Sequence, residues 1–483
     1  MASIKGNIMK VIQKLNLFTV KLVALMLGLA TFLVNATDEN TAEKPNFIII
    51  IADDLGYGDV GYTGSTEIRT PHIDALAKSG VIFDQGYVSA PVCGPSRAGL
   101  ITGRNQVNFG FDNNNVSPGP QYNREYFGLP ITEKTIADRL AKQGYVNGMI
   151  GKWHLGDEAH FQATKRGFDD VWTYPYGGHD YFRTDPNSDE KYLQPLISNY
   201  KTPDPITYIT DDTGKESIDF IKRNKDKPFF LYASFNAPHA PLQALQEDID
   251  LYKHIKNENR RVYAAMIHRL DVNVGKIIQS LKSEGVYDNT VVVFLSDNGG
   301  PGTGKKSRTV NAPFRGSKGI LLEGGIHVPF IMSWPKGLKA NSHYENPVTS
   351  LDLTPTFVAL AGGDISAKDK IDGHNIYPYL SGEKTGNPNQ EMKWRFTVSA
   401  SIRDGDWKLI RLPDRLPLLY NVKEDVAELN DVADQHKTRV VQMLKALGDW
   451  DVSTPQHLYM EGAKYKKIQL KSYEAEYRIT QPK

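Results

Sequence analysis

Residues 46–51 read Asn-Phe-Ile-Ile-Ile-Ile, and the acidic pair Asp53-Asp54 follows one residue later. An apolar run without polar alternation is typical of a strand buried on both faces, as in a parallel sheet covered by helices. In open α/β sheets, ligands bind just beyond the carboxyl ends of the strands. This segment therefore predicts an α/β fold with polar site residues at a strand end.

Strands and helices alternate along most of the chain. Apolar runs predict strands at Phe229–Phe235, Thr290–Ser296 and His327–Ser333, and helical patterns lie at His72–Ser79, Pro95–Gly103, Thr132–Gln143, Asn257–Ser283 and Ser350–Leu360. Residues 105–128 and 173–213 look like long loops, which in compact domains are usually functional or disordered. The alternation predicts a large mixed, mostly parallel sheet sandwiched by helices.

The pattern changes after about Gly373. Short strand-like runs and a final helix are predicted at Arg395–Ser399, Trp407–Arg411, Leu416–Tyr420 and Thr438–Leu447. We therefore expect a smaller C-terminal antiparallel sheet with a helix. The predicted organisation is a signal peptide at 1–36, a main α/β domain at 37–375, an α+β subdomain at 376–453 and a tail at 454–483.

The first residues have the composition of a secretory signal peptide. They contain four lysines and no acidic residue up to Ala36, and an apolar run of about 13 residues spans Leu22 to Val34. The alternative is an uncleaved membrane anchor, but a spanning helix needs about 20 apolar residues. We expect cleavage near Ala36, a periplasmic or secreted protein, and no membrane attachment after cleavage.

Composition excludes several classes of protein. The chain has 483 residues, and 57 Lys and Arg residues nearly balance 56 Asp and Glu residues. A nucleic-acid-binding protein is not expected, because phosphate binding needs a clustered excess of positive charge. The single cysteine, Cys93, excludes an intramolecular disulfide and a cysteine-rich zinc site. The sequence leaves the oligomeric state open.

Oxygen ligands follow two of the predicted strands. Asp53-Asp54 follows the first apolar run, and Asp297-Asn298 follows Thr290–Ser296. Adjacent carboxylates repel each other unless a cation lies between them. Oxygen donors without His or Cys suit Ca²⁺ first and Mg²⁺ second. Turn formation or helix capping would explain either pair alone, but the repetition at two strand ends favours a metal site.

Cys93 and Arg97 lie at a predicted helix start. Pro95 suits the first helical position, and backbone N–H groups at helix N-termini favour anions. A small buried thiol is the simple alternative for Cys93. Arg97, however, occupies the first turn, where the helix dipole disfavours a cation, so we interpret it as the holder of an anion.

Four further basic side chains follow predicted strands or turns: Lys152, His154, His239 and Lys318. Each alone is explained as a structural histidine or a solvated lysine. If the strands before them point the same way, two imidazoles and two ammonium groups would surround a metal and a nucleophile. Such a set suits the transfer of an oxyanion group.

The segment Cys93–Arg104 (CGPSRAGLITGR) matches the C-x-P-S-R-x-x-L-x-T-G-R motif of type I sulfatases, the formylglycine-dependent members of the alkaline phosphatase superfamily. Five other segments agree in the same order: ADDLGYGDVGYTG (52–64), GKWHLG (151–156), NAPHAP (236–241), SDNGG (296–300) and RGSKGILLEGGIHVP (315–329). The resemblance runs from about Asn46 to Asp425. It implies an alkaline-phosphatase-like fold and hydrolysis of a sulfate ester.

The resemblance also implies two cofactors. A separate formylglycine-generating maturation enzyme would oxidise Cys93 to Cα-formylglycine, whose hydrated gem-diol attacks sulfur. One Ca²⁺ per chain would be bound by residue 93 together with Asp53, Asp54, Asp297 and Asn298. The metal would also bind the sulfate and orient it for attack.

Roles for the remaining residues follow from the same resemblance. Arg97 and Lys152 would stabilise the diol oxygens. Lys318 would contact the sulfate, and His239 would be the general acid for the departing alcohol. His154 would take a proton from the second hydroxyl, so that sulfate is released and the aldehyde returns.

The substrate is predicted less directly. Residues 237–243 followed by a long helix resemble the galactosamine-4-sulfatase-like branch and marine polysaccharide sulfatases, which act on sulfated glycans. We expect a galactose-type sulfate, as in carrageenan or a glycosaminoglycan. Lys305, Lys306 and Arg308 could bind neighbouring anionic groups, or be solvated loop charges. The alternatives are an arylsulfatase of small substrates, a phosphonate monoester or phosphodiester hydrolase, and a non-enzymatic Ca²⁺-dependent glycan-binding protein.

Overall fold

The computed structural model describes residues 44–114, 124–185, 190, 192–302, 308–413 and 415–458, with 4–10, 12–16 and a few isolated terminal positions. The chain divides into two compact units, Met1–Lys44 and Pro45–Lys483. Residues 4–10 and 12–16 of the first unit are helical. Ala36 lies outside the described residues, as does most of the apolar run before it, so the signal peptide stays a prediction. Within the part of the chain that the structure describes, a helix with the length and apolar character of a membrane span is not found.

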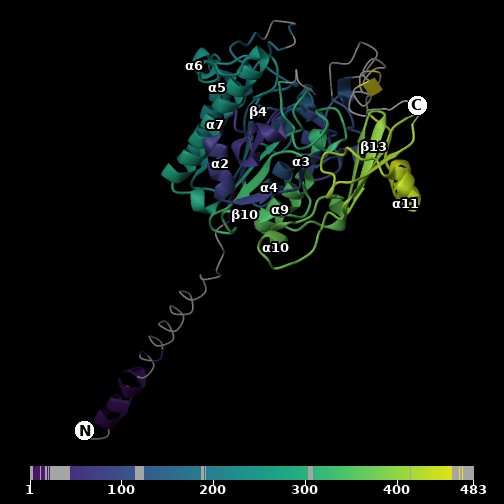
Figure 1. Cartoon of the computed structure of the whole chain (residues 1–483). Coiled ribbons are helices and arrows are strands. Elements are labelled where there is room, and N and C mark those ends of the chain that lie inside the picture. The colour runs from purple at the N-terminus through teal and green to yellow at the C-terminus, as the bar shows by residue number, and fades with distance from the viewer. Residues whose placement is uncertain are drawn as a thin grey trace, which may run out of the picture. The chain divides into compact units, whose positions relative to one another are not determined.

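A nine-stranded sheet forms the centre of the second unit, in the spatial order β10-β2-β9-β8-β1-β7-β4-β5-β6 (Figure 1). The strands are β1 (Asn46–Ala52), β2 (Val81–Phe83), β4 (Val146–Lys152), β5 (Asp170–Tyr174), β6 (Ile197–Ser198), β7 (Phe229–Ser234), β8 (Thr290–Ser296), β9 (Phe330–Ser333) and β10 (Ser342–Tyr344). β1 pairs in parallel with β7 and β8, whereas β9 and β6 pair antiparallel with their neighbours. The prediction of a mixed, mostly parallel sheet is confirmed.

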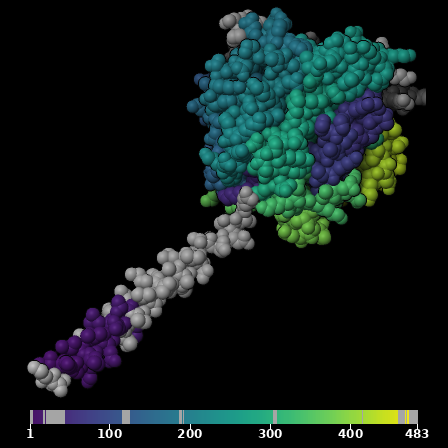
Figure 2. All heavy atoms as spheres, turned by 90° about the vertical axis from the view of Figure 1, so that its left-hand side faces the viewer, coloured from purple at the N-terminus to yellow at the C-terminus, as the bar shows by residue number. Residues whose placement is uncertain are grey.

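Helices cover both faces of this sheet, because successive side chains of a strand point to opposite sides. In β1, Phe47, Ile49 and Ile51 belong to one buried cluster, whereas Ile48 and Ile50 belong to another. The first cluster includes side chains of α3 (Cys93–Thr102), α4 (Ile136–Ala141) and α9 (Leu353–Leu360). The second includes side chains of α2 (Pro71–Lys78), α5 (Ile209–Asn224) and α7 (Glu258–Ser283). These three helices lie on the left-hand side of Figure 1, which faces the viewer in Figure 2.

Several predicted segments differ from the structure. The strand expected at His327–Ser333 begins at Phe330, and the run Arg395–Ser399, expected to be one strand, lies across the turn between two strands, Glu391–Phe396 and Ser399–Asp404. The helix expected at Thr132–Gln143, with Thr132 as N-cap, begins at Ile136 and ends at Ala141. Thr135 is its N-cap, because the Thr135 hydroxyl accepts a hydrogen bond from Asp138 N at 3.0 Å, and the Asp138 carboxylate accepts one from Thr135 N at 2.9 Å. The stretch 173–213 is not loop throughout, since it contains β6 and the beginning of α5.

The C-terminal part forms the predicted antiparallel sheet with a helix. Its strands are β12 (Glu391–Phe396), β13 (Ser399–Asp404), β14 (Trp407–Arg411) and β15 (Leu418–Asn421), in that order, and α11 (Lys437–Ser453) packs on them. A separate two-stranded sheet joins β3 (Gly86–Tyr87) and β11 (Val348–Thr349). The division at residue 375 stays a prediction.

A buried ion network ties the small sheet to a short helix outside that sheet. Lys408 on β14 is fully buried, and its ammonium lies 2.7 Å from Glu323 Oε1 and 3.0 Å from Glu428 Oε1. Glu323 begins α8 (Glu323–Ile326), and the Glu323 backbone N–H donates a hydrogen bond to the Glu428 carboxylate at 2.7 Å. Burial raises the pKa of Glu428 to about 7. Lys408 therefore compensates two carboxylates that have little access to water.

Replacing Lys408 should destabilise the protein strongly. Lys408→Met keeps the aliphatic volume but leaves Glu323 and Glu428 without their ammonium partner. Removal of one member of a buried ion pair costs about 3–5 kcal/mol. We expect that loss in the free energy of unfolding, measured by urea denaturation. The control is Lys393→Met on β12, whose partner Glu391 is exposed, with an expected cost below about 1 kcal/mol. Equal effects of the two substitutions would contradict the role of Lys408 as the partner of two buried carboxylates.

Candidate active site

The two acidic pairs predicted from the sequence lie side by side. β1 and β8 are parallel neighbours with Ala52 opposite Ser296, so the residues that follow them meet at one sheet edge. The Asp54 backbone N–H donates to Asp297 Oδ1 at 3.2 Å, and Asn298 Nδ2 donates to Asp54 Oδ1 at 2.8 Å. All of these residues are buried. The structure therefore gathers the predicted ligand set in one place.

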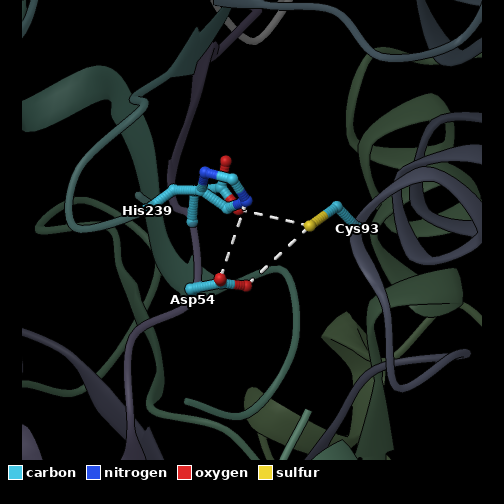
Figure 3. Close-up of side chains that lie close together, drawn as sticks. Asp54, Cys93 and His239 are labelled. Carbon is cyan, nitrogen blue, oxygen red and sulfur yellow. Dashed lines mark hydrogen bonds and ion pairs between the residues drawn. The ribbon is translucent and has the colours of Figure 1, made fainter. Parts of the chain in front are cut away.

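Cys93 is the first residue of α3, and its side chain points into this acidic cluster (Figure 3). Its Sγ lies 3.3 Å from Asp53 Oδ1 and 3.9 Å from Asp54 Oδ1, and Lys318 Nζ lies 3.0 Å from it. Burial raises the pKa of the Cys93 thiol well above its ordinary value, and the charge of Asp297 adds to the shift. An unmodified Cys93 is therefore a neutral thiol and a poor nucleophile at neutral pH.

Three cations neutralise the three carboxylates of the cluster. Arg97 Nε donates a hydrogen bond to Asp297 Oδ2 at 2.9 Å, and Arg97 Nη2 forms an ion pair with the same oxygen at 2.8 Å. Lys152 pairs with Asp53, and Lys318 Nζ lies 2.6 Å from Asp54 Oδ1. With a neutral thiol, the formal charges sum to zero. Arg97, Lys152 and Lys318, which lie far apart in the sequence, thus converge on the acidic residues.

The surroundings shift the pKa values of Asp54 and Asp297 in opposite directions. Burial alone would raise the pKa of Asp54, but the charges of Lys318 and His239 reverse this and hold it well below its ordinary value. Burial and the neighbouring charge of Asp53 raise the pKa of Asp297 above its ordinary value, although Arg97 acts in the opposite direction. Asp54 is therefore the more firmly ionised of the two carboxylates.

Both predicted histidines lie in the site as neutral imidazoles. His239 Nε2 is 3.7 Å from Asp54 Oδ2, and its Nδ1 lies 2.6 Å from the Ala240 carbonyl, so Nδ1 carries the proton in the neutral ring. Burial lowers the pKa of His239 to about 3. Burial and the charge of Lys152 lower the pKa of His154 well below its ordinary value. The exchangeable proton position of His239 is therefore Nε2, on the side of Asp54.

Two contacts of the site were not predicted. Arg97 Nη1 donates to Ser234 Oγ at 2.5 Å, and the Gly94 backbone N–H donates to Asn114 Oδ1 at 3.0 Å. Ser234 ends β7, so the strand-end rule would have found it if small hydroxyl residues had been included. Asn114 contacts residue 94 from a loop, and the local sequence carries no signal for that contact.

The predicted substrate residues are not tested by the structure. Lys305 and Lys306 lie outside the described residues. The Arg308 carbonyl accepts a hydrogen bond from Arg260 Nη1 at 3.0 Å, and no described contact joins its guanidinium to Cys93 or to the acidic cluster. These three substrate contacts stay predictions.

The donor set fits a hard cation. One ligand atom each from Asp53, Asp54, Cys93 and His239 lies within 4.8 Å of the others. Asn298 Oδ1 is buried and has no hydrogen-bond partner among the described residues. A buried amide oxygen without a donor is unfavourable, and a cation would satisfy it. Carboxylate and amide oxygens at one point are the ligands that Ca²⁺ and Mg²⁺ prefer.

Comparisons with known proteins point to one family. The sequence profile described as Sulfatase matches residues 45–363, and that described as N-sulphoglucosamine sulphohydrolase, C-terminal, matches residues 317–448. Arylsulfatase J of Mus musculus is 34% identical over 76% of this chain, and N-acetylgalactosamine-6-sulfatase of Homo sapiens is 33% identical over 70%. The chain spans 64% and 66% of the length of these two curated relatives.

A solved structure is similar over nearly its whole length. Ps i-CgsB is 37% identical, with a TM-score of 0.81, and the match covers 89% of this chain and 97% of that one. The same protein has been solved in complex with k-i-k-neocarrahexaose. Fold and comparisons together define an alkaline-phosphatase-like α/β protein. Within that class, this chain belongs to the sulfatase family, whose members hydrolyse sulfuric esters.

Proposed function

We propose that this protein is an exported sulfatase that removes a sulfate ester from a carbohydrate, a galactose-type sulfate of a polysaccharide or oligosaccharide such as carrageenan or a glycosaminoglycan. The observation that carries the proposal is the position of residue 93, whose side chain lies among Asp53, Asp54 and Lys318 at the start of a helix. A helix N-terminus, a cation site and an ammonium group all favour a bound sulfate.

The proposed chemistry also requires a bound cation and a formylglycine at position 93. Residue 93, Asp53, Asp54, Asp297 and Asn298 would hold one Ca²⁺, with Mg²⁺ as the second choice. Calcium would supply positive charge that orients the sulfate, and formylglycine at position 93 would supply an oxygen nucleophile in place of the poorly reactive thiol. A separate maturation enzyme would form this formylglycine from Cys93.

The protein's own side chains bind the sulfate and move protons. Lys318 reaches both the residue 93 side chain and Asp54, so its ammonium can contact a sulfate bound at residue 93. Arg97 and Lys152 pair with Asp297 and Asp53 and keep positive charge close to residue 93. His239 is the proposed general acid at Nε2, because Nδ1 is fixed on the Ala240 carbonyl. The negative charge of the substrate would raise the pKa of His239 and supply the condition for its protonation. His154 is the proposed proton acceptor for the residue 93 nucleophile.

The proposed substrate class rests on the relatives. Ps i-CgsB binds a neocarrahexaose, and a second relative is an N-acetylgalactosamine-6-sulfatase. The printed names of similar proteins therefore include one neocarrahexaose ligand and one N-acetylgalactosamine sulfatase activity. Lys305, Lys306 and Arg308 are the proposed contacts to neighbouring anionic groups.

Turnover of defined substrates tests the substrate class. The matured enzyme is incubated with position-defined sulfated oligosaccharides of the carrageenan and galactosamine classes, an aryl sulfate and a phosphate diester. We expect kcat/KM on one oligosaccharide to exceed that on the aryl sulfate by at least about tenfold, because remote sugar contacts add binding energy in the transition state. An equal or faster reaction with the aryl sulfate would favour a small-substrate arylsulfatase, and a faster reaction with the phosphate diester would favour a phosphodiesterase.

Mass spectrometry tests maturation and export. The peptide that contains Cys93 should be about 18 Da lighter than its thiol form when the cysteine has become formylglycine. The N-terminus of the exported protein should lie near Asn35 to Thr37. Active enzyme whose residue 93 remains a thiol would overturn the proposed nucleophile.

A further inference from the structure

Asp54 has a backbone conformation that non-glycine residues rarely adopt. Its φ is +67°, in the left-handed region. In an extended strand, successive side chains point to opposite faces, so adjacent Asp53 and Asp54 carboxylates would diverge. Here both lie near Cys93 Sγ, at 3.3 and 3.9 Å. The turn at Asp54 therefore lets two neighbouring carboxylates serve one site, and something must stabilise it.

A tyrosine of helix α7 bridges this turn. Tyr263 is fully buried, and its hydroxyl donates to the Asp54 carbonyl at 2.9 Å. The same hydroxyl accepts a hydrogen bond from the Gly56 backbone N–H at 3.2 Å. One oxygen atom thus fixes the backbone on both sides of Leu55. The Tyr263 side chain contacts the backbone of this turn and does not take part in the proposed chemistry.

The hydroxyl of Tyr263 is itself held in place. Asp59 Oδ2 lies 3.2 Å from it as a second acceptor for its single proton, and also accepts a hydrogen bond from Val310 N at 3.0 Å. Arg260, one helical turn before Tyr263 on α7, donates to Asp59 Oδ1 at 2.5 Å. Buried hydrogen-bond partners of this kind orient the groups that contact a metal, and their removal typically weakens metal binding 10- to 100-fold.

We infer that Tyr263 is a positioning residue for the cation site: it holds the Asp54 backbone in its left-handed turn and so presents the Asp54 carboxylate to the bound cation. This inference rests on the proposed function, because it needs the cation site around Asp54. Helix α7, which is far in sequence from the motif that carries Cys93, thus contributes to metal affinity.

Tyr263→Phe tests the inference with the loss of a single hydroxyl. The matched control is Tyr145→Phe, because the Tyr145 hydroxyl is also buried and donates to the Pro45 carbonyl at 2.7 Å, at the opposite end of β1. Full-length wild type and both variants are stripped with a chelator, and CaCl₂ is titrated into each in a calorimeter. This measurement needs neither substrate nor maturation of Cys93.

We expect the Ca²⁺ dissociation constant to rise at least tenfold in Tyr263→Phe and to stay within about twofold of wild type in Tyr145→Phe. The sulfatase rate of matured Tyr263→Phe should recover when CaCl₂ is raised well above the new dissociation constant. An unchanged dissociation constant, or an equal loss in both variants, overturns the inference and leaves the proposed function standing. Failure of wild type to bind Ca²⁺ overturns the calcium part of the proposed function, and this inference with it.

Discussion

Cys93→Ala is expected to lower the hydrolysis of sulfate esters by about 10⁴- to 10⁶-fold, the loss seen when an enzyme loses its covalent nucleophile. The remaining cations can still bind a sulfate, but no atom at position 93 can attack sulfur. Because Cys93 is small and buried at a helix start, alanine fits the same space. The rate is measured on an aryl sulfate and on the best oligosaccharide, with wild type matured in the same host.

Glycan binding provides the control for this substitution. Affinity of Cys93→Ala for the sulfated oligosaccharide should remain within about tenfold of wild type, since Lys318, Lys152 and Arg97 are intact. Turnover close to the wild-type rate would refute Cys93 as the nucleophile. A wild type that binds glycan tightly but turns over none, despite a matured residue 93, would instead favour the non-enzymatic glycan-binding protein.

Removal of the cation should abolish activity without unfolding the protein. Arg97, Lys152 and Lys318 already balance Asp53, Asp54 and Asp297, so the stripped cluster carries no net charge when the thiol is neutral. Stripping therefore should cost only the linkage free energy of the metal, about 4 kcal/mol at a thousandfold excess over its dissociation constant. We expect a rate loss of at least about 10³-fold, because the sulfate is no longer oriented or neutralised by the metal. Rates and thermal unfolding are measured before and after chelation.

Metal replacement separates the two candidate cations. CaCl₂ should restore the rate, and MgCl₂ should restore less, because Mg²⁺ demands octahedral geometry and keeps its water ligands. Global unfolding on chelation would show that the three cations do not suffice to compensate the acidic cluster. Full activity after complete removal of divalent ions would refute the metal site.

The parts of the structure that follow from local sequence were predictable. β1 and β8 are continuous apolar runs, and the acidic pairs come directly after them, so both the strands and the site could be placed before the fold was known. Tyr263 could not be predicted, because it meets Asp54 only through the packing of a helix more than two hundred positions later. Arg97 was predictable as an anion holder, yet its direct partners in the structure are Asp297 and Ser234.

Helix α5 was missed for a different reason. Its buried face contains Thr213, Gly214 and Ser217 beside Ile209 and Phe220. Residues 210–214 read Thr-Asp-Asp-Thr-Gly, a composition typical of turns, so the sequence predicts a loop here although Ile209, Phe220 and Ile221 lie on one buried face. The N-cap of α4 was wrongly predicted at Thr132. Thr135 is the N-cap instead, because Thr135 and Asp138 form reciprocal hydrogen bonds at the helix start.

The ion network around Lys408 limits how this chain can be recombined with its relatives. α8 carries Glu323, and its Gly324 N–H donates to the Arg315 carbonyl at 2.7 Å, while the Gly299 N–H donates to the Gly325 carbonyl at 3.0 Å. Lys408 of the small sheet thus holds a helix that contacts both the loop of Lys318 and the residue after Asn298. A chimera with its crossover between α8 and β14 would inherit Glu323 from one parent and its ammonium partner from the other. Crossovers upstream of Arg315 keep the network within one parent, and those are the junctions at which hybrid enzymes should fold.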